Sequence, residues 1–175
     1  GQGICSFWKG TSCLNDKIEI GEQIVLDEVE KTHLYSSILC LYSTSKELCL
    51  YDMENKKILV KTRYISKVRK LFIYKSLFCI HFRAWRSSYL RAYDLENNGT
   101  SVDFEHLDWI LGKEKNVLIG INTNNKIAIW DTTTGILLHE LSIFFYNRNT
   151  VKYSNGMLYV YRGSKYQSFQ LHSFL

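Results

Sequence analysis

LIGINTNNKIAIWDTTTGILLHEL, at residues 118–141, is the most informative segment of the sequence. Its central part, KIAIW, alternates apolar residues with polar or small ones, which is the period-two pattern of a half-buried antiparallel strand. Two runs rich in Asn, Thr and Gly interrupt the apolar residues, and such runs form tight turns. The segment therefore predicts three strands joined by turns, at 117–121, 126–130 and 136–141.

Similar units recur along the chain at intervals of about 40 residues. Each is an apolar strand, a polar turn and a second strand that ends in an aromatic residue followed by Asp. The aromatic residues are Tyr51, Tyr93 and Trp130, separated by 42 and 37 residues. A β-sandwich or an irregular barrel is the alternative for antiparallel units of this size, but neither needs such pairs at near-constant intervals. Blade repeats place such pairs at near-constant intervals, because every blade has the same inner and outer strands.

The pair Trp130-Asp131 resembles the one that names the WD-repeat family, and IAIWDTTTG resembles the third strand and following turn of a WD-repeat blade. This resemblance implies an all-β fold, a WD-repeat-like β-propeller. In that family a histidine, a serine or threonine, a turn aspartate and the tryptophan form a buried hydrogen-bonded set. Carried over to this chain, the resemblance implies a structural set of His106, Asn122, Asn124 and Trp130.

Some repeats depart from the family pattern, since tyrosine replaces tryptophan in two of them and Asn124 replaces the turn aspartate. At about 40 to 45 residues per blade, the 175 residues make about four blades. Isolated four-blade rings are rare, and Trp8 lies 43 residues before Tyr51, as if the chain started inside a third strand. We therefore expect residues 1–175 to form a single, partial propeller domain that belongs to a larger propeller.

Cysteine usage and hydropathy indicate an intracellular protein, cytoplasmic or nuclear. The five cysteines include no C-x-x-C pair, and Cys40, Cys49 and Cys79 lie inside apolar runs, as buried thiols do in a reducing compartment. Zinc-ligand spacing is missing, so we expect no metal. No stretch approaches 18 consecutive apolar residues, so no membrane span is expected.

Catalytic motifs are missing from the sequence. Gly-rich phosphate loops, H-E-x-x-H and G-x-S-x-G do not occur. His106 and Asp108 lie close in sequence, but one histidine and one carboxylate are too few for a catalytic or metal site. We expect His106 to be a buried structural histidine, the protein not to be an enzyme, and no cofactor to be required.

Charge is distributed unevenly around a formal net charge of +5. Residues 61–91 hold nine bases and no acid, whereas residues 1–30 hold six acids and two bases. In the blade interpretation, the loop entering a blade and the turn between its second and third strands share one rim. The candidate partner-binding residues of this rim are Arg63, Lys67, Arg69, Lys70, Trp85 and Arg86.

Two plainer interpretations of the basic stretch stay open. Its bases can form a solvated face that balances the acidic residues 1–30, and Arg83 and Arg91 can protect an outer sheet edge. Its interleaved aromatic residues can be core residues rather than a stacking platform. The stretch by itself therefore does not establish a binding site.

The resemblance implies a non-catalytic protein-interaction scaffold or adaptor that binds a partner through the propeller rim. Arginine pairs bidentately with carboxylate or phosphate, so we expect acidic or phosphorylated protein partners, and also a chain that completes the propeller. The alternative is a nucleic-acid- or phosphate-binding module that uses the basic stretch at 61–91. Strong salt dependence of binding would favour that alternative, because phosphate contacts release counterions.

Overall fold

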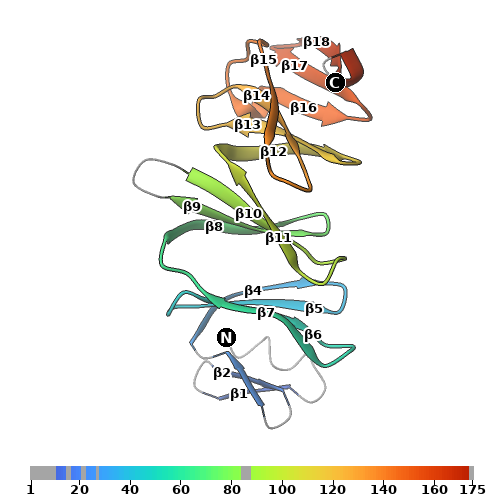
Figure 1. Ribbon diagram of the computed structural model, residues 1–175. Coiled ribbons are helices and arrows are strands. Elements are labelled where there is room, and N and C mark those ends of the chain that lie inside the picture. Colours follow the sequence, from blue (N-terminus) through green and yellow to red (C-terminus); the bar gives the residue numbers. More distant parts are fainter. Residues whose placement is uncertain (1–10, 15–16, 21–22, 27, 84–87, 174–175) are drawn as a thin grey trace. The chain divides into compact units, whose positions relative to one another are not determined.

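The computed structural model describes residues 11–14, 17–20, 23–26, 28–83 and 88–173, and side chains from Leu26 to His172 within them (Figure 1). The described residues form eighteen β-strands and two short 3-10 helices, and no α-helix occurs among them. The prediction of an all-β fold is therefore confirmed.

The strands form five sheets, each made of strands consecutive in sequence. The first contains β1 (Thr11–Leu14), β2 (Lys17–Ile20) and β3 (Gln23–Leu26). The second contains β4 (Val29–Tyr35), β5 (Ile38–Ser43), β6 (Glu47–Asp52) and β7 (Lys57–Arg63). The third contains β8 (Lys67–Tyr74), β9 (Leu77–Arg83), β10 (Ser88–Asp94) and β11 (Thr100–Glu105).

The fourth sheet contains β12 (Leu107–Glu114), β13 (Val117–Asn122), β14 (Ile127–Asp131) and β15 (Leu137–Leu141). The fifth contains β16 (Val151–Ser154), β17 (Met157–Arg162) and β18 (Lys165–Gln170). The 3-10 helices η2 (Arg148–Thr150) and η3 (Leu171–Ser173) flank the fifth sheet in sequence. The three strands expected within 117–141 are thus present, each within one residue of its predicted bounds.

The chain divides into two compact units, and the third sheet contributes to both. The first unit comprises Gly1–Lys67, Leu71–Cys79 and Tyr93–Thr100, and the second comprises Val68–Lys70, Ile80–Ala92 and Ser101–Leu175. The core of the first unit includes Leu39, Leu41 and Cys49, which β5 and β6 supply. The core of the second is formed by residues of the fourth and fifth sheets and of the segments flanking the fifth.

The three aromatic residues of the repeat occupy equivalent positions, as predicted. Tyr51, Tyr93 and Trp130 are each the last residue but one of the third strand of a four-stranded sheet. All three are buried, with 4%, 4% and 0% of their surface exposed. A buried Tyr or Trp needs a partner for its polar atom, and Tyr93 shares a hydrogen bond with the buried Tyr64 hydroxyl.

The aspartate after each aromatic residue closes the turn to the fourth strand. Asp52 and Asp94 each accept a hydrogen bond from the backbone N–H two residues further on, at 3.0 and 3.1 Å. Asp131 accepts from the N–H groups of Thr133 and Thr134, both at 2.8 Å. The hydrogen bond from the Thr133 hydroxyl, together with those from these N–H groups and the Thr134 hydroxyl, lowers the pKa of Asp131 to about 2. The repeated aromatic-Asp pair is therefore a core residue followed by a turn-closing residue.

The three cysteines that the sequence places in apolar runs are buried free thiols. Burial raises the pKa of Cys40 and Cys79 to about 12 and that of Cys49 to about 11. They are therefore protonated at neutral pH and serve as small apolar core residues. Within the described part of the chain no helix is long and apolar enough to span a membrane.

Candidate functional site

The predicted hydrogen-bonded set is only partly reproduced, and the expectation of a buried His106 is wrong. His106 is exposed and has a left-handed backbone (φ 59°) at the connection from β11 to β12. Its backbone N–H donates to the carbonyl of Ser88, and its own carbonyl accepts from Thr123. This tight connection uses the backbone of His106 and leaves the imidazole at the surface.

Trp130 and Asn122 are fixed by partners other than His106. The Trp130 Nε1 donates to the backbone carbonyl of Glu105 at 3.2 Å. The side-chain oxygen of Asn122 accepts from the N–H groups of Asn124 and Lys126, both at 3.0 Å, so it closes the β13–β14 turn. Asn124 therefore takes part through its backbone, where the resemblance implied a side chain.

The six candidate partner-binding residues fall into three groups. Trp85 and Arg86 lie outside the described residues. Arg63 and Lys67 are exposed and belong to the first unit, where the Arg63 Nε donates to the carbonyl of Ser45 at 3.2 Å. Arg69 and Lys70 are exposed and belong to the second unit.

In the second unit, Arg69 and Lys70 meet β12 and η2. The Arg69 Nη1 lies 3.3 Å from the Asp108 Oδ1, and the Arg148 Nη1 lies 3.9 Å from the Asp108 Oδ2. The Lys70 Nζ lies 5.3 Å from the centre of the Trp109 ring, and the Arg148 guanidinium carbon lies 4.4 Å from it. We call these five residues the Trp109 cluster.

Charge within the Trp109 cluster is unbalanced, with three cations and one carboxylate. The Asp108 side chain is 27% exposed, whereas those of Arg69 and Arg148 are 58% and 49% exposed. An approaching ligand therefore meets the guanidinium groups before it meets the carboxylate. Because Asp108 is shared between two guanidinium groups, it positions both of them and leaves a net positive site. Guanidinium groups held this way bind carboxylate or phosphate.

Trp109 gives the cluster a rigid support. The residue is partly buried and packs against the core of the second unit. Cations placed over an indole ring within about 6 Å are attracted by the ring's electron density. The ring therefore limits the positions that Lys70 and Arg148 can take, which lowers the entropy cost of binding a ligand there.

His81 lies next to the cluster and is nearly fully buried, with 4% of its surface exposed. Its Nε2 is 4.0 Å from the Asp108 Oδ1 and has no hydrogen-bond partner among the described residues. Burial lowers the pKa of His81; Asp108 opposes this effect, and Arg69 and Lys70 add to it. The imidazole is therefore neutral at pH 7.

We expect the protein to lose stability when the pH falls below 6.5, the ordinary pKa of histidine. A pKa lowered by folding means that the unfolded chain binds a proton at a higher pH than the folded chain does, so acidification favours unfolding. Urea denaturation at pH 7.5, 6.5 and 5.5 measures this loss for the wild type and for His81→Gln. The variant should lose less stability over the same range. The stability of the variant should still depend on pH to some extent, because burial also lowers the pKa of His33. Equal losses of stability in the wild type and in His81→Gln would show that protonation of His81 does not cause the pH dependence.

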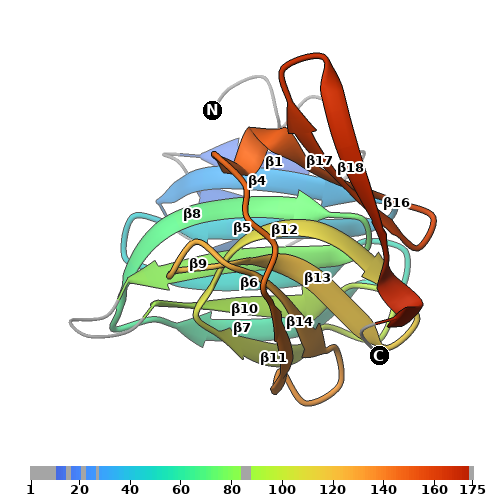
Figure 2. The same cartoon turned by 90° about the horizontal axis from the view of Figure 1, so that it is seen from above.

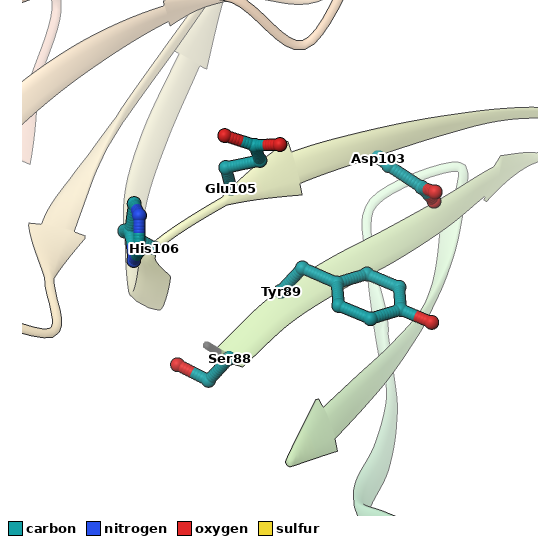
Figure 3. Close-up of a pocket in the computed structure, with 5 residues that line it drawn as sticks. All are labelled: Ser88, Tyr89, Asp103, Glu105 and His106. Carbon is teal, nitrogen blue, oxygen red and sulfur yellow. The ribbon is translucent and has the colours of Figure 1, made fainter. Parts of the chain in front are cut away.

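A pocket of about 280 Å³ lies elsewhere in the second unit, lined by Ser88, Tyr89, Asp103, Glu105 and His106 (Figure 3). Asp103 is paired bidentately with Arg91, at 2.6 and 2.8 Å. The Tyr89 ring is stacked on Phe82, with the ring centres 4.9 Å apart. The pocket therefore combines an occupied carboxylate and a fixed ring with two exposed polar side chains, Glu105 and His106. Within the described residues, no group of three or more His, Cys, Asp or Glu side chains could hold a metal ion.

Several solved structures are similar to this chain. The computationally designed protein Ika4 has a TM-score of 0.50 and 11% identity over 82% of this chain and 91% of its own. The designed protein Ika8 has a TM-score of 0.50 and 12% identity over 91% of this chain and 57% of its own. BamB from Moraxella catarrhalis has a TM-score of 0.50 and 12% identity over 93% of this chain and 61% of its own.

The fold is β-propeller-like. Identities this low show the fold alone, and the chain spans less than two thirds of the length of Ika8 and of BamB. No protein-family model and no curated protein sequence matches the chain. Membership of the WD-repeat family therefore stays a prediction.

Sequence reasoning did not find Trp109, Arg148 or His81. One signal was present for Arg148, because Glu140 is the last acidic residue of the chain. The 35 residues that follow hold Arg148, Lys152, Arg162 and Lys165 and no acid. No comparable signal marks Trp109 or His81, because their importance depends on which strands lie beside them.

Proposed function

We propose that this protein is a non-catalytic interaction scaffold or adaptor that binds an acidic segment of a partner protein. The observation that carries the proposal is the Trp109 cluster, in which Arg69 and Arg148 flank Asp108 while Arg148 and Lys70 lie over the Trp109 ring. A propeller-like fold supports a binding role only by analogy, because one fold hosts many functions. The proposal therefore depends on the chemistry of the cluster.

The cluster suits a carboxylate-rich or phosphorylated peptide. Arg69 and Arg148 can donate paired N–H groups to a carboxylate or phosphate, and Lys70 adds a point charge. The Trp109 ring provides apolar area for a neighbouring side chain of the partner, and Trp and Arg are the residue types that dominate binding energies at protein interfaces. Positive charge at the rim of a site also speeds the encounter with an acidic partner.

We also propose that the protein acts inside the cell, in the cytoplasm or the nucleus. Three buried cysteines are free thiols, which is the usual state in a reducing compartment. A chain that completes the propeller is a further expected partner. If the chain belongs to a larger propeller, its unpaired edge strands would favour association with such a chain.

The basic stretch at 61–91 supports the nucleic-acid alternative less well than its sequence suggested. Arg69 is paired with Asp108, and Arg91 is paired bidentately with Asp103. Both carboxylates come from outside the stretch, so part of its charge is neutralised within the second unit. For this region we favour an acidic protein segment as the ligand.

Reversing two charges of the cluster, Lys70→Glu with Arg148→Glu, should weaken binding of an acidic peptide about tenfold or more, or about 1.4 kcal/mol. The probe is a fluorescein-labelled peptide of sixteen glutamates, measured by fluorescence anisotropy at two salt concentrations. Lys56→Glu with Lys57→Glu is the matched control. It makes the same charge change at two exposed residues of the first unit.

The control variant should bind within about twofold of the wild type, and thermal melts verify that both variants fold. Affinity capture from cell extract is then followed by mass spectrometry. It identifies the proteins that bind to the wild type and the control but not to the cluster variant. Equal peptide affinity in all three proteins would contradict a role for the Trp109 cluster. An equal loss in both variants would show that only net charge matters.

A further inference from the structure

The last sheet carries tyrosines on the face opposite the core. Figure 2 shows β17 and β18 as a long hairpin beside β16. Along β17, Leu158 and Val160 are buried in the core of the second unit, so Tyr159 and Tyr161 occupy the other face. The strand register places Tyr166 directly opposite Tyr161. The inner face therefore anchors the sheet, and the outer face holds three rings together.

Lys152 of β16 completes this outer face. It lies opposite Tyr159 in the register, and its Nζ is 5.5 Å from the centre of the Tyr161 ring. The centre of the Tyr166 ring is 5.7 Å from those of Tyr159 and Tyr161, and the Tyr159–Tyr166 pair is T-shaped. Tyr166 is 59% exposed, so a planar ligand can reach its ring.

A second combination of rings and a cation lies on the other side of the hairpin. The Arg162 guanidinium carbon is 5.8 Å from the centre of the Phe144 ring, and Phe144 packs edge-on against Tyr146 at 5.4 Å. Phe144 and Tyr146 are 65% and 66% exposed. Lys165 lies opposite Arg162 in the register and adds a second exposed cation at the end of the hairpin.

All charged residues of β16, β17 and β18 are basic. Of the five sheets described, the fifth is the only one in which no strand contains Asp or Glu, and no acidic residue follows Glu140 in the sequence. Exposed aromatic rings next to cations, without carboxylates, favour a ligand that has both planar rings and negative charge.

We propose that this hairpin binds single-stranded nucleic acid through both of its sides. Lys152, Tyr161 and Tyr166 lie on its outer face, and Phe144, Tyr146, Arg162 and Lys165 lie on the other side. A nucleotide needs a ring on which its base can stack and a cation near its phosphate. The hairpin and its neighbours supply this combination once on each side, in Tyr161 with Lys152 and in Phe144 with Arg162. An acidic peptide would use the cations and leave the rings without partners, whereas a duplex would keep its bases stacked inside and unavailable to the rings.

Fluorescence anisotropy with labelled fifteen-nucleotide oligo(dT) and oligo(rU) tests the proposal on the full chain. Tyr166→Ala, which removes a ring, should weaken binding about tenfold, whereas Tyr166→Phe, which keeps the ring, should stay within about twofold. Lys165→Glu should weaken binding and reduce its salt dependence, since each phosphate contact contributes about −0.7 to the slope of log affinity against log salt for single strands. Lys57→Glu, in the first unit, makes the same charge change and should have little effect.

Competition identifies the ligand class. An unlabelled duplex of the same length and a peptide of sixteen glutamates should each displace the single strand at least about tenfold less well than unlabelled oligo(dT) does. Equal competition by the peptide would overturn the proposal and assign the surface to acidic proteins. Failure of the wild type to bind either oligonucleotide at micromolar concentration, or unchanged binding by Tyr166→Ala and Lys165→Glu, would also overturn it.

Discussion

Trp130→Ala is expected to lower the free energy of unfolding by about 3–5 kcal/mol. The indole is fully buried, and its Nε1 donates to the carbonyl of Glu105, so truncation leaves a cavity and removes this hydrogen bond. Domains of this size have about 5–15 kcal/mol of stability in total. The variant should therefore lose a large fraction of that stability. Urea denaturation followed by far-UV circular dichroism measures the loss without relying on the fluorescence of the deleted residue.

Trp130→Phe and Ile65→Ala are the comparison variants. Trp130→Phe keeps most of the buried ring but not the N–H, so it should lose less stability than Trp130→Ala does. Ile65 is 97% exposed, so its truncation should change stability by no more than about 0.5 kcal/mol. A loss below about 1 kcal/mol in Trp130→Ala would show that the fourth sheet does not depend on this residue.

Gly135→Ala is expected to be the second most damaging change. Gly135 lies in the turn from β14 to β15 with φ at 74°, a region that alanine adopts at a cost of about 1–2 kcal/mol. A Cβ at this position would also overlap the backbone carbonyl oxygen of Asp103, which has little freedom to move within β11. The combined cost should exceed about 3 kcal/mol.

Gly163→Ala separates the two contributions. Gly163 lies in the β17–β18 turn with φ at 65°, and a Cβ there would have no neighbouring atom within 4 Å. This variant should therefore lose only the backbone contribution, about 1–2 kcal/mol. Chemical denaturation measures the loss of stability in both variants. The amount by which Gly135→Ala loses more than Gly163→Ala is the cost of the contact with Asp103. If the two losses were equal, close packing of the turn against β11 would be excluded.

Local sequence chemistry determined the strands and turns of this protein. Alternation predicted strands near β13, β14 and β15, and the aromatic-Asp spacing placed Tyr51, Tyr93 and Trp130 on equivalent strands. Such predictions succeed because alternation and turn closure act between residues close in the chain. Asp131, for example, closes its turn with Thr133 and Thr134, two and three residues further on.

Tertiary structure alone decided which side chains meet and which of them face solvent. Asp108 contacts Arg69 and Arg148, which are 39 and 40 residues away along the chain, so the Trp109 cluster exists only once the strands and η2 are assembled. The resemblance to WD repeats misplaced His106, because its left-handed backbone in a tight connection leaves its imidazole exposed. Contacts of this kind depend on the stacking and register of distant strands, where a shift of one residue turns every side chain of a strand to the opposite face.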